Sequence, residues 1–204
     1  MSGKFIVLEG GEGAGKSTVA RFLKEQLPKE QFLFTREPGG TPLAEKIRTV
    51  FISTEASEAN GETELALVWA GRLDHVRAKI TPVREAGKTV ISERFDSSTY
   101  AYQIYGQEAP HLKPLFFEFR KLLHNTLPDI YIFLDVVPEE GLRRVRRSGK
   151  PTDHFEQKSL DFHKRVHEGY LEFFKTVQSV VVDANRPLRE VQKDVLALVK
   201  KALA

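Results

Sequence analysis

A glycine-rich segment between a short apolar run and a helical pattern constrains this chain more than any other feature. Residues 8–19 read LEGGEGAGKSTV, which matches the phosphate-loop pattern G-x-x-x-x-G-K-[ST] from Gly10 to Ser17. Glycine weakens strands and helices, so its repetition indicates that bare backbone N–H groups surround a ligand. A plain glycine-rich turn is the alternative, but the expected strand before the loop and helix after it favour nucleotide binding.

The loop assigns roles to its own residues. Lys16 places a positive charge at the terminal phosphates of a nucleoside triphosphate, and Ser17 offers a hydroxyl group to Mg²⁺. The amino terminus of the following helix adds a favourable dipole. The predicted nucleotide-binding residues are Gly10, Gly11, Glu12, Gly13, Ala14, Gly15, Lys16, Ser17 and Thr18.

Strand and helix patterns alternate along the whole chain. Apolar runs predict strands over residues 4–10, 31–35, 88–92, 129–137 and 179–184. Apolar spacings of three and four predict helices over 16–27, 41–52, 62–86, 155–177 and 188–202, with Ser159 on the apolar face of the fourth. This alternation predicts an α/β fold with a parallel sheet covered on both faces.

Composition limits the class of protein. The 204 residues suffice for one domain, 1–204, and the absence of cysteine excludes disulfides and thiolate metal sites. No apolar run approaches the roughly 20 residues that span a bilayer, so we expect a soluble cytoplasmic protein. A basic run at residues 143–150, RRVRRSGK, suits polyphosphate, nucleic acid or solubility alone.

A missing motif and the positions of the basic side chains indicate which type of phosphate-loop protein this is. No guanine-reading Asn-Lys-x-Asp motif occurs, which argues against a GTPase. A kinase for a small acceptor needs several cations and a closing segment that keeps water from the phosphate. The polar stretch 148–154 suits a mobile loop, and further cations stand at Arg36, Arg48, Arg72 and Arg94.

Five ordered motifs resemble the bacterial type of the thymidylate kinase family. They are LEGGEGAGKST, TREPGGT (35–41), ERFDSSTYAYQ (93–103), FLDVVPEEGLRR (133–144) and FHKRVHEGY (162–170). The resemblance implies a P-loop nucleoside monophosphate kinase fold: a five-stranded parallel sheet, helices on both faces and a lid at about residues 141–157. It implies phosphate transfer from ATP to dTMP with Mg²⁺ by a homodimer, with no membrane partner and no expected nucleic-acid partner.

The same resemblance assigns the site. It implies an acceptor site for dTMP at Glu37, Arg48, Val68, Arg72, Arg94, Thr99, Tyr102 and Gln103. Adenine is expected at Asn185 and Arg186, and magnesium at Ser17 and Glu93. The expected catalytic residues are Lys16, Arg94, Glu12 and the lid arginines Arg147 and Arg146, with Arg147 favoured and Arg143 and Arg144 as supports or solvated charges.

Three positions depart from the family pattern. Glu93 stands where the family has Asp, which moves the carboxylate outward by about a bond length. Val68 replaces an aromatic residue that stacks on the base, with Trp69 next to it. His154 replaces a lid arginine. The last two departures bear on base preference and lid charge.

Two alternatives stay open on the sequence alone. The first is a kinase for another deoxynucleoside monophosphate. The second is a non-catalytic nucleotide sensor or nucleic-acid-binding protein, in which the basic run contacts a phosphate backbone. Asp135, at the end of a strand, is either a metal-site acid or a turn cap.

Overall fold

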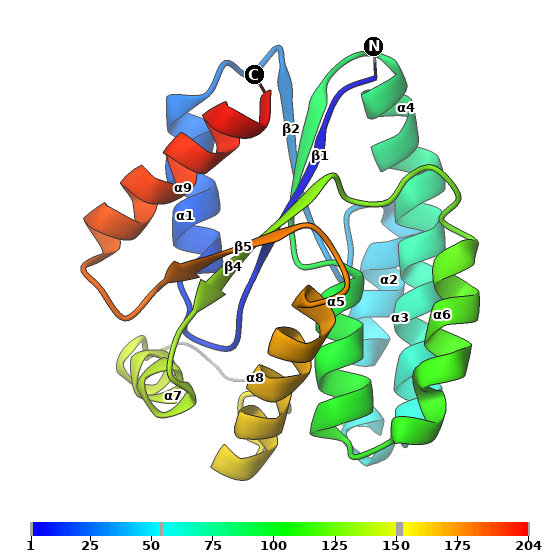
Figure 1. The fold of residues 1–204 in the computed structure, drawn as a ribbon. Helices are drawn as coiled ribbons and strands as arrows, with labels where there is room; N and C mark the ends of the chain where they lie inside the picture. Colours follow the sequence, from blue (N-terminus) through cyan, green and yellow to red (C-terminus); the bar gives the residue numbers. More distant parts are fainter. Residues whose placement is uncertain (1, 54, 150–152, 204) are drawn as a thin grey trace.

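A five-stranded parallel sheet forms the centre of the computed structural model, which describes residues 2–53, 55–149 and 153–203 (Figure 1). Its strands are β1 (Phe5–Glu9), β2 (Phe32–Arg36), β3 (Thr89–Glu93), β4 (Ile130–Asp135) and β5 (Ser179–Asp183). Their order is β2-β3-β1-β4-β5, and every neighbouring pair is parallel. All five predicted strands are present, each slightly shorter than or shifted from its expected range.

Helices cover both faces of this sheet, as predicted. Helices α1 (Lys16–Gln26) and α9 (Leu188–Leu203) lie together on one face, over the core cluster that contains Ile6 and Leu8 (Figure 1). Helices α3 (Gly61–His75), α6 (Lys113–Lys121) and α8 (Leu160–Phe174) cover the other face, over Phe5 and Val7. Alternate residues of β1 therefore serve two different cores, which explains its continuous apolar sequence.

The first crossovers agree with the predicted helices. Helix α2 (Pro42–Phe51) begins after Thr41, whose Oγ1 accepts a hydrogen bond from Ala44 N, and it packs on α3. The predicted long helix over 62–86 is present as α3, a π-helical turn at Val76–Ile80 and α4 (Thr81–Glu85). Pro82 lies in the first turn of α4, where a missing N–H costs little.

Two helical regions differ from the expectation. The sequence predicted no helix between β3 and β4, yet α5 (Asp96–Thr99), a π-helix (Tyr100–Gly106), a 3₁₀ turn (Pro110–Leu112) and α6 fill it. The predicted start of a helix at Phe155 was wrong. Helix α8 begins at Leu160, and Ser159 is not on its apolar face but is its cap, accepting from Phe162 N at 3.2 Å.

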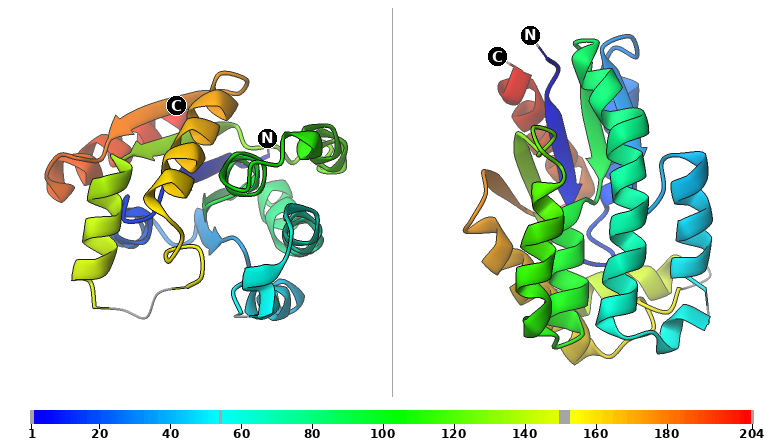
Figure 2. Two further views of the ribbon diagram at one scale, coloured as in Figure 1. Left: turned by 90° about the horizontal axis from the view of Figure 1, so that it is seen from below. Right: turned by 90° about the vertical axis from the view of Figure 1, so that its right-hand side faces the viewer.

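The predicted lid, residues 141–157, is only partly described. Helix α7 (Pro138–Arg147) supplies its first part, and residues 154–157 form a turn before α8 (Figure 2). Residues 150–152, at the centre of the predicted lid, lie outside the described residues. Within the described ranges, no helix is long and apolar enough to cross a membrane.

Candidate active site

The glycine-rich loop joins the central strand β1 to α1, at the carboxyl edge of the sheet where ligands of such folds bind. Gly13 shows why the loop excludes side chains. Its φ is 68°, and a Cβ atom there would lie 2.1 Å from the carbonyl oxygen of Gly141 at the start of α7. The close approach therefore fixes the loop against α7 as well as opening it toward phosphate.

Lys16 is buried beneath this loop. Its Nζ donates hydrogen bonds to the carbonyl oxygens of Gly10 and Gly11, each at 2.8 Å. Burial and the nearby charge of Arg94 lower the pKa of Lys16 to about 8, although Glu12 and Glu9 act in the opposite direction. The ammonium group is therefore bonded only to neutral carbonyl oxygens within the loop. Negatively charged phosphate oxygens of a bound nucleotide would stabilise its charge further.

The buried carboxylate of Glu9 holds the segment after β3 in place. It accepts hydrogen bonds from Phe95 N at 2.8 Å, Ser97 Oγ at 2.6 Å and Ser98 Oγ at 2.8 Å. These bonds help to keep Arg94 at a φ of 65°, a conformation that residues other than glycine rarely adopt. The side chain of Arg94 is thereby aimed at the phosphate loop.

Arg94, Glu12 and Tyr102 form one hydrogen-bonded group. Arg94 Nη2 lies 2.6 Å from Glu12 Oε1, and the Tyr102 hydroxyl donates to the same oxygen at 2.5 Å. Burial alone would raise the pKa of Glu12, but the charges of Arg94 and Lys16 and the Tyr102 bond outweigh it and lower the pKa to about 2. Two predicted catalytic residues and one substrate residue therefore meet at the loop.

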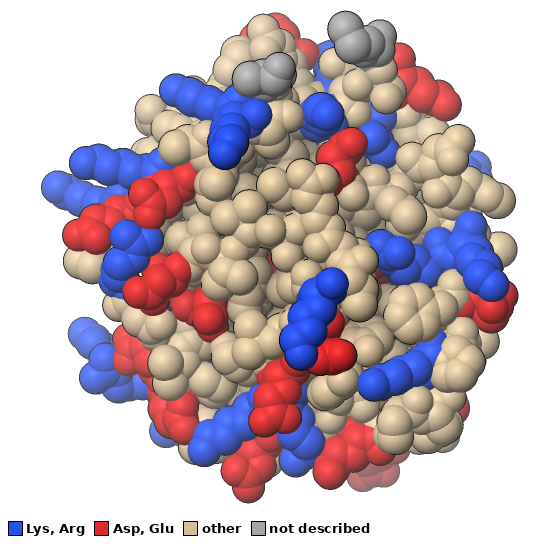
Figure 3. Space-filling view, in the orientation of Figure 1, with Lys and Arg blue, Asp and Glu red and all other residues tan. Residues whose placement is uncertain are grey.

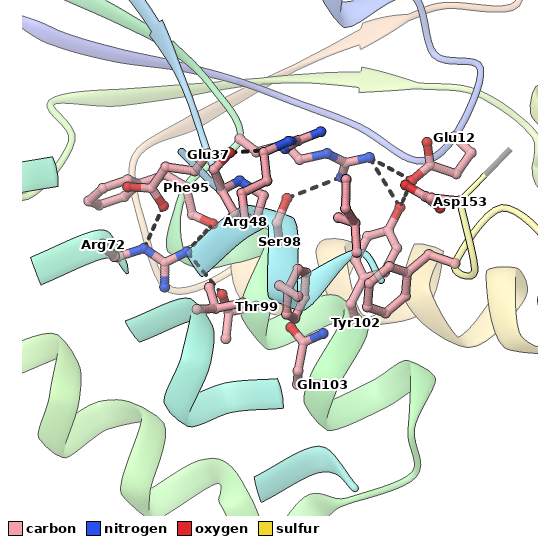
Figure 4. A pocket seen from close by; sticks show the side chains of 16 residues that line it. Glu12, Glu37, Arg48, Arg72, Phe95, Ser98, Thr99, Tyr102, Gln103 and Asp153 are labelled. Atoms are coloured by element: carbon pink, nitrogen blue, oxygen red, sulfur yellow. Dashed lines mark hydrogen bonds and ion pairs between the residues drawn. The ribbon is translucent and has the colours of Figure 1, made fainter. Parts of the chain in front are cut away.

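A pocket lies beside this group (Figure 4). All eight residues predicted for the acceptor site line it: Glu37, Arg48, Val68, Arg72, Arg94, Thr99, Tyr102 and Gln103. Glu12, Phe51, Asp153 and Phe155 are further lining residues. Segments from four parts of the sequence thus build one cavity next to the phosphate loop.

Arg72 is held in this pocket by three hydrogen bonds. Its Nε donates to Glu37 Oε2 at 2.7 Å, and its Nη2 donates to Phe95 O and to Thr99 Oγ1. The guanidinium carbon lies 4.6 Å from the ring centre of Trp69. Its Nη1 is buried and has no hydrogen-bond partner among the described residues. Leaving a buried charged donor without an acceptor costs free energy, so an acceptor atom of a bound ligand would stabilise it.

Glu37 and Arg48 frame the other side of the pocket. Glu37 accepts from Arg72 and also contacts His75 Nδ1 at 3.0 Å, so its carboxylate is fully engaged in fixing Arg72. Arg48 Nη1 donates to Pro38 O at 2.9 Å, and its other nitrogens make no hydrogen bond with the residues that the structure describes. Arg48 and Arg94 add positive charge to the pocket beside Arg72.

The pocket has no aromatic side chain at position 68, and the neighbouring Trp69 does not take its place. Val68 lines the pocket, while Trp69 is fully buried and packs against Phe116 and Phe119 on α6. Trp69 therefore does not replace the missing aromatic residue at position 68. Phe155, whose ring centre lies 5.2 Å from that of Phe51, lines the same pocket. Its contribution carries no local sequence signal, because it comes from a turn far from α3 in sequence.

A second pocket opens on the other side of the phosphate loop. It is lined by Gly13, Gly15 and Thr18 and by Arg144, Arg186 and Leu188. Arg144 reaches this pocket and donates to Ala184 O at 2.9 Å and, at 3.5 Å, to Gly13 O. Arg186 is paired with Asp194 at 2.6 Å. Asn185 is not among the lining residues: its Oδ1 accepts from Val137 N, so it ties the turn after β5 to the end of β4.

Arg146 and Arg147 are exposed on α7, and neither makes an ion pair with a residue that the structure describes. Arg143 and Arg144 both bond to Glu140, which neutralises part of the basic run. Basic and acidic side chains are interspersed over the face drawn in Figure 3. Asp135 contacts His167 Nε2 at 2.7 Å at the end of β4.

Ser17 and Glu93, the predicted metal pair, lie side by side. The hydroxyl group of Ser17 donates to Glu93 Oε2 at 2.6 Å. Among the described residues, no three His, Cys, Asp or Glu side chains form a metal-binding cluster. The pair fits Mg²⁺ in a nucleotide site, where phosphate oxygens and water supply most ligands and the protein supplies one or two.

The two pockets share one phosphate loop, an arrangement that brings two nucleotides together for transfer between them and defines a P-loop kinase of the nucleoside monophosphate class. The sequence matches the family model described as thymidylate kinase over residues 8–195. The chain belongs to the thymidylate kinase family. These findings confirm the predicted fold, family and class of enzyme.

Individual relatives agree over the whole chain. The thymidylate kinase of Magnetococcus marinus is 37% identical, with 94% of this chain and 92% of that protein covered. The thymidylate kinase of Thermoanaerobacter sp. is 38% identical over 100% of both chains. A crystal structure of thymidylate kinase from Ehrlichia chaffeensis has a TM-score of 0.74 and 27% identity, and the match covers 98% of this chain and 99% of that one.

Proposed function

We propose that this protein transfers the γ-phosphoryl group of ATP to dTMP, giving ADP and dTDP. Family membership supports the reaction, and one observation of this structure supports the acceptor. Arg72 Nη1 is a buried cationic donor with no partner among the described residues, in a pocket that Thr99 and Gln103 also line. The O4 carbonyl of thymine is an acceptor that would satisfy it.

The chemistry needs positive charge more than a base. A nucleoside monophosphate has its second pKa near ~6, so it is already mostly a dianion at pH 7. Arg94 and Arg48 would hold that dianion, and Lys16 would leave the carbonyl oxygens of Gly10 and Gly11 for the phosphates of ATP. The residues of this site therefore position and neutralise two polyanions, which is how phosphoryl transfer is accelerated.

Ser17 and Glu93 are the residues that we propose to hold Mg²⁺, Ser17 through its hydroxyl and Glu93 through its carboxylate. The ion would neutralise charge on the phosphate chain of ATP. The lid arginines Arg146 and Arg147 remain our proposed source of further charge on the transferred group. Arg144, already 3.5 Å from Gly13 O, is the better placed of the α7 arginines for the bound ATP itself.

We also propose a homodimer. Four exposed apolar side chains lie on two helices on the same side of the molecule (Figure 1), Leu43 and Val50 on α2 and Leu115 and Phe117 on α6. Covering them with a second copy would remove apolar surface from water. Light scattering of the wild type and of Phe117→Glu tests this: a dimer that becomes monomeric in the variant is expected. A cytoplasmic location stays a prediction.

The decisive experiment is an assay of ATP-dependent ADP formation with dTMP, dUMP, dCMP, dGMP and dAMP. Highest kcat/KM with dTMP is expected, and the Lys16→Ala variant serves as the inactive control. Highest kcat/KM with a different monophosphate would indicate another kinase of the same fold. No turnover with any of them, together with salt-sensitive DNA binding, would support the non-catalytic alternative.

A further inference from the structure

A buried carboxylate lies beside the acceptor pocket and makes no ion pair with a residue that the structure describes. Glu64 on α3 is completely buried, and its two oxygens accept hydrogen bonds from the side-chain amides of Gln103 and Gln107, each at 3.0 Å. No Lys, Arg or His in the described ranges hydrogen-bonds to it. Burying a carboxyl group that is hydrogen-bonded only by two neutral amides costs free energy of folding. We therefore expect a functional reason for this arrangement.

The bond from Gln103 fixes which way its amide group faces. Gln103 Nε2 donates to Glu64 Oε2 at 3.0 Å, so the NH₂ group of Gln103 faces Glu64 and its oxygen does not. Gln103 Oε1 then remains on the other side, and it has no hydrogen-bond partner in the part of the chain that the structure describes. Gln103 itself lines the acceptor pocket, between Thr99 and Tyr102 in Figure 4.

The pocket therefore offers two groups of opposite polarity to a base. Within the described part of the chain, Arg72 Nη1 is a buried donor without a partner, and Gln103 Oε1 accepts no hydrogen bond. Thr99 Oγ1, which accepts from Arg72 Nη2 at 2.9 Å, belongs to the same lining. Thymine presents the matching order on its Watson–Crick edge, O4 as acceptor and N3–H as donor. Cytosine presents the reverse, an amino donor and a bare N3 acceptor.

We propose that Glu64 is a positioning residue that selects the base: it holds the Gln103 amide with its oxygen toward the pocket, so that a pyrimidine with N3–H is accepted and cytosine is rejected. This inference rests on the proposed function and adds the origin of base selection. Glu64 does not touch the substrate and acts only through Gln103. Sites that hydrogen-bond one polar pattern reject the opposite one strongly, because buried groups are then left unpaired.

The test compares dTMP with the monophosphate of 5-methyl-deoxycytidine, which has the same shape and differs only on that edge. In Glu64→Gln, the amide at position 64 can face Gln103 with either its oxygen or its NH₂ group, so the orientation of Gln103 is no longer fixed. The ratio of kcat/KM for dTMP to kcat/KM for the methylated cytidine nucleotide should fall about 10- to 100-fold. The change should appear mainly in KM for the monophosphate, with KM for ATP unchanged.

A matched control and a rescue separate selection from general damage. Glu62→Gln makes the same chemical change on the same helix, at an exposed carboxylate that contacts His111, and should leave the ratio unaltered. The double variant Glu64→Gln/Gln103→Glu reverses the pair and restores an acceptor-only group facing the pocket, so the preference for dTMP should return. If Glu64→Gln fails to fold, this double variant carries the test, since it keeps an amide–carboxylate pair.

The outcomes are distinguishable. A wild-type protein that does not phosphorylate dTMP would refute the proposed function itself. A wild type with strong dTMP preference, and a Glu64→Gln variant that keeps the wild-type ratio within about twofold, would overturn only the role of Glu64. A double variant that folds yet shows no preference would do the same.

Discussion

Ser17 and Glu93 are joined by a hydrogen bond of 2.6 Å although 76 residues separate them in sequence. Ser17 lies in the first turn of α1 after the phosphate loop, and Glu93 ends β3. Because β1 and β3 are parallel neighbours, their carboxyl ends bring these residues to one edge of the sheet. The longer side chain of Glu93, relative to the aspartate that the family pattern has there, still reaches the loop.

The first prediction concerns this pair. Glu93→Gln removes a negative charge from the proposed magnesium position while keeping side-chain volume. The Mg²⁺ concentration for half-maximal activity should rise about 10-fold or more, as found when groups around metal ions are changed. Titration of activity with MgCl₂ at fixed ATP measures it, and Glu25→Gln, exposed on α1, is the control. An unchanged magnesium requirement would remove Glu93 from the site.

The second prediction concerns Lys16. Lys16→Ala should lower turnover about 10²-fold or more, because a charge aimed at the transferring phosphates is lost. The fold should persist, since the lysine is buried with a pKa lowered to about 8 and contributes little to stability in its charged form. Steady-state kinetics and thermal unfolding measure the two effects, with Lys24→Ala on the same helix as control. Turnover above about a tenth of the wild-type value would contradict the assignment.

The third prediction concerns Arg72. Arg72→Lys keeps the charge but cannot make the separate bonds to Glu37, Phe95 O and Thr99 together with one to the ligand. KM for dTMP should rise about 10- to 100-fold, the worth of one or two hydrogen bonds to a charged group. Arg77→Lys changes an exposed arginine on the next turn and should leave KM alone. Equal KM values in both variants would contradict the placement of thymine beside Arg72.

The fourth prediction concerns pH. The folded-state pKa of Glu12, about 2, lies below its ordinary value of 4.5, so the ionised carboxylate stabilises the fold above pH 4.5. That stabilisation is lost as pH falls from 4.5 toward 2. The stability difference between the wild type and Glu12→Gln, about 3 kcal/mol at neutral pH, should shrink over this interval. Urea unfolding at several pH values measures it, and a difference independent of pH would contradict the Arg94 pairing.

The fifth prediction separates the arginines of α7. Arg146→Ala/Arg147→Ala should lower kcat roughly 10- to 10³-fold with little change in KM, because a contact made only in the transition state affects kcat alone. Arg144→Ala should instead raise KM for ATP, since Arg144 lines the second pocket. Arg143→Ala, exposed on the same helix, is the control. Full kcat in the double variant would show that these arginines do not act on the transferred group.

Much of this fold could be predicted from local sequence patterns. The phosphate loop and the five strands depend on short-range features, glycine spacing and continuous apolar runs, and these were predicted. The segment from Asp96 to Gly106 was not recognised as helical, because its π-helical turns do not follow the spacing of an α-helix. The start of α8 was misplaced because Phe155 is apolar for a tertiary reason: it lines the pocket.

Some residues of the candidate site could be predicted from the sequence, and others could not. Residues within motifs, such as Glu37 and Gln103, line the pocket, and so does Arg72 outside them. Glu64 was missed because a glutamate on an amphipathic helix normally faces solvent, and only the fold shows that this one is buried behind Gln103. Arg144 was assigned a supporting role because α7 alone does not reveal which arginine turns toward Gly13.

The two pockets draw on almost separate stretches of chain. Residues 37–103 supply most of the acceptor pocket, whereas 144–148 and 184–191 supply most of the second one, and the phosphate loop and residues 153–156 contribute to both. Heritable change in α3 or in the segment after β3 can therefore alter which base is accepted while the grip on the donor nucleotide stays intact. The acceptor specificity of such a protein can therefore change during evolution while binding of the donor nucleotide is retained.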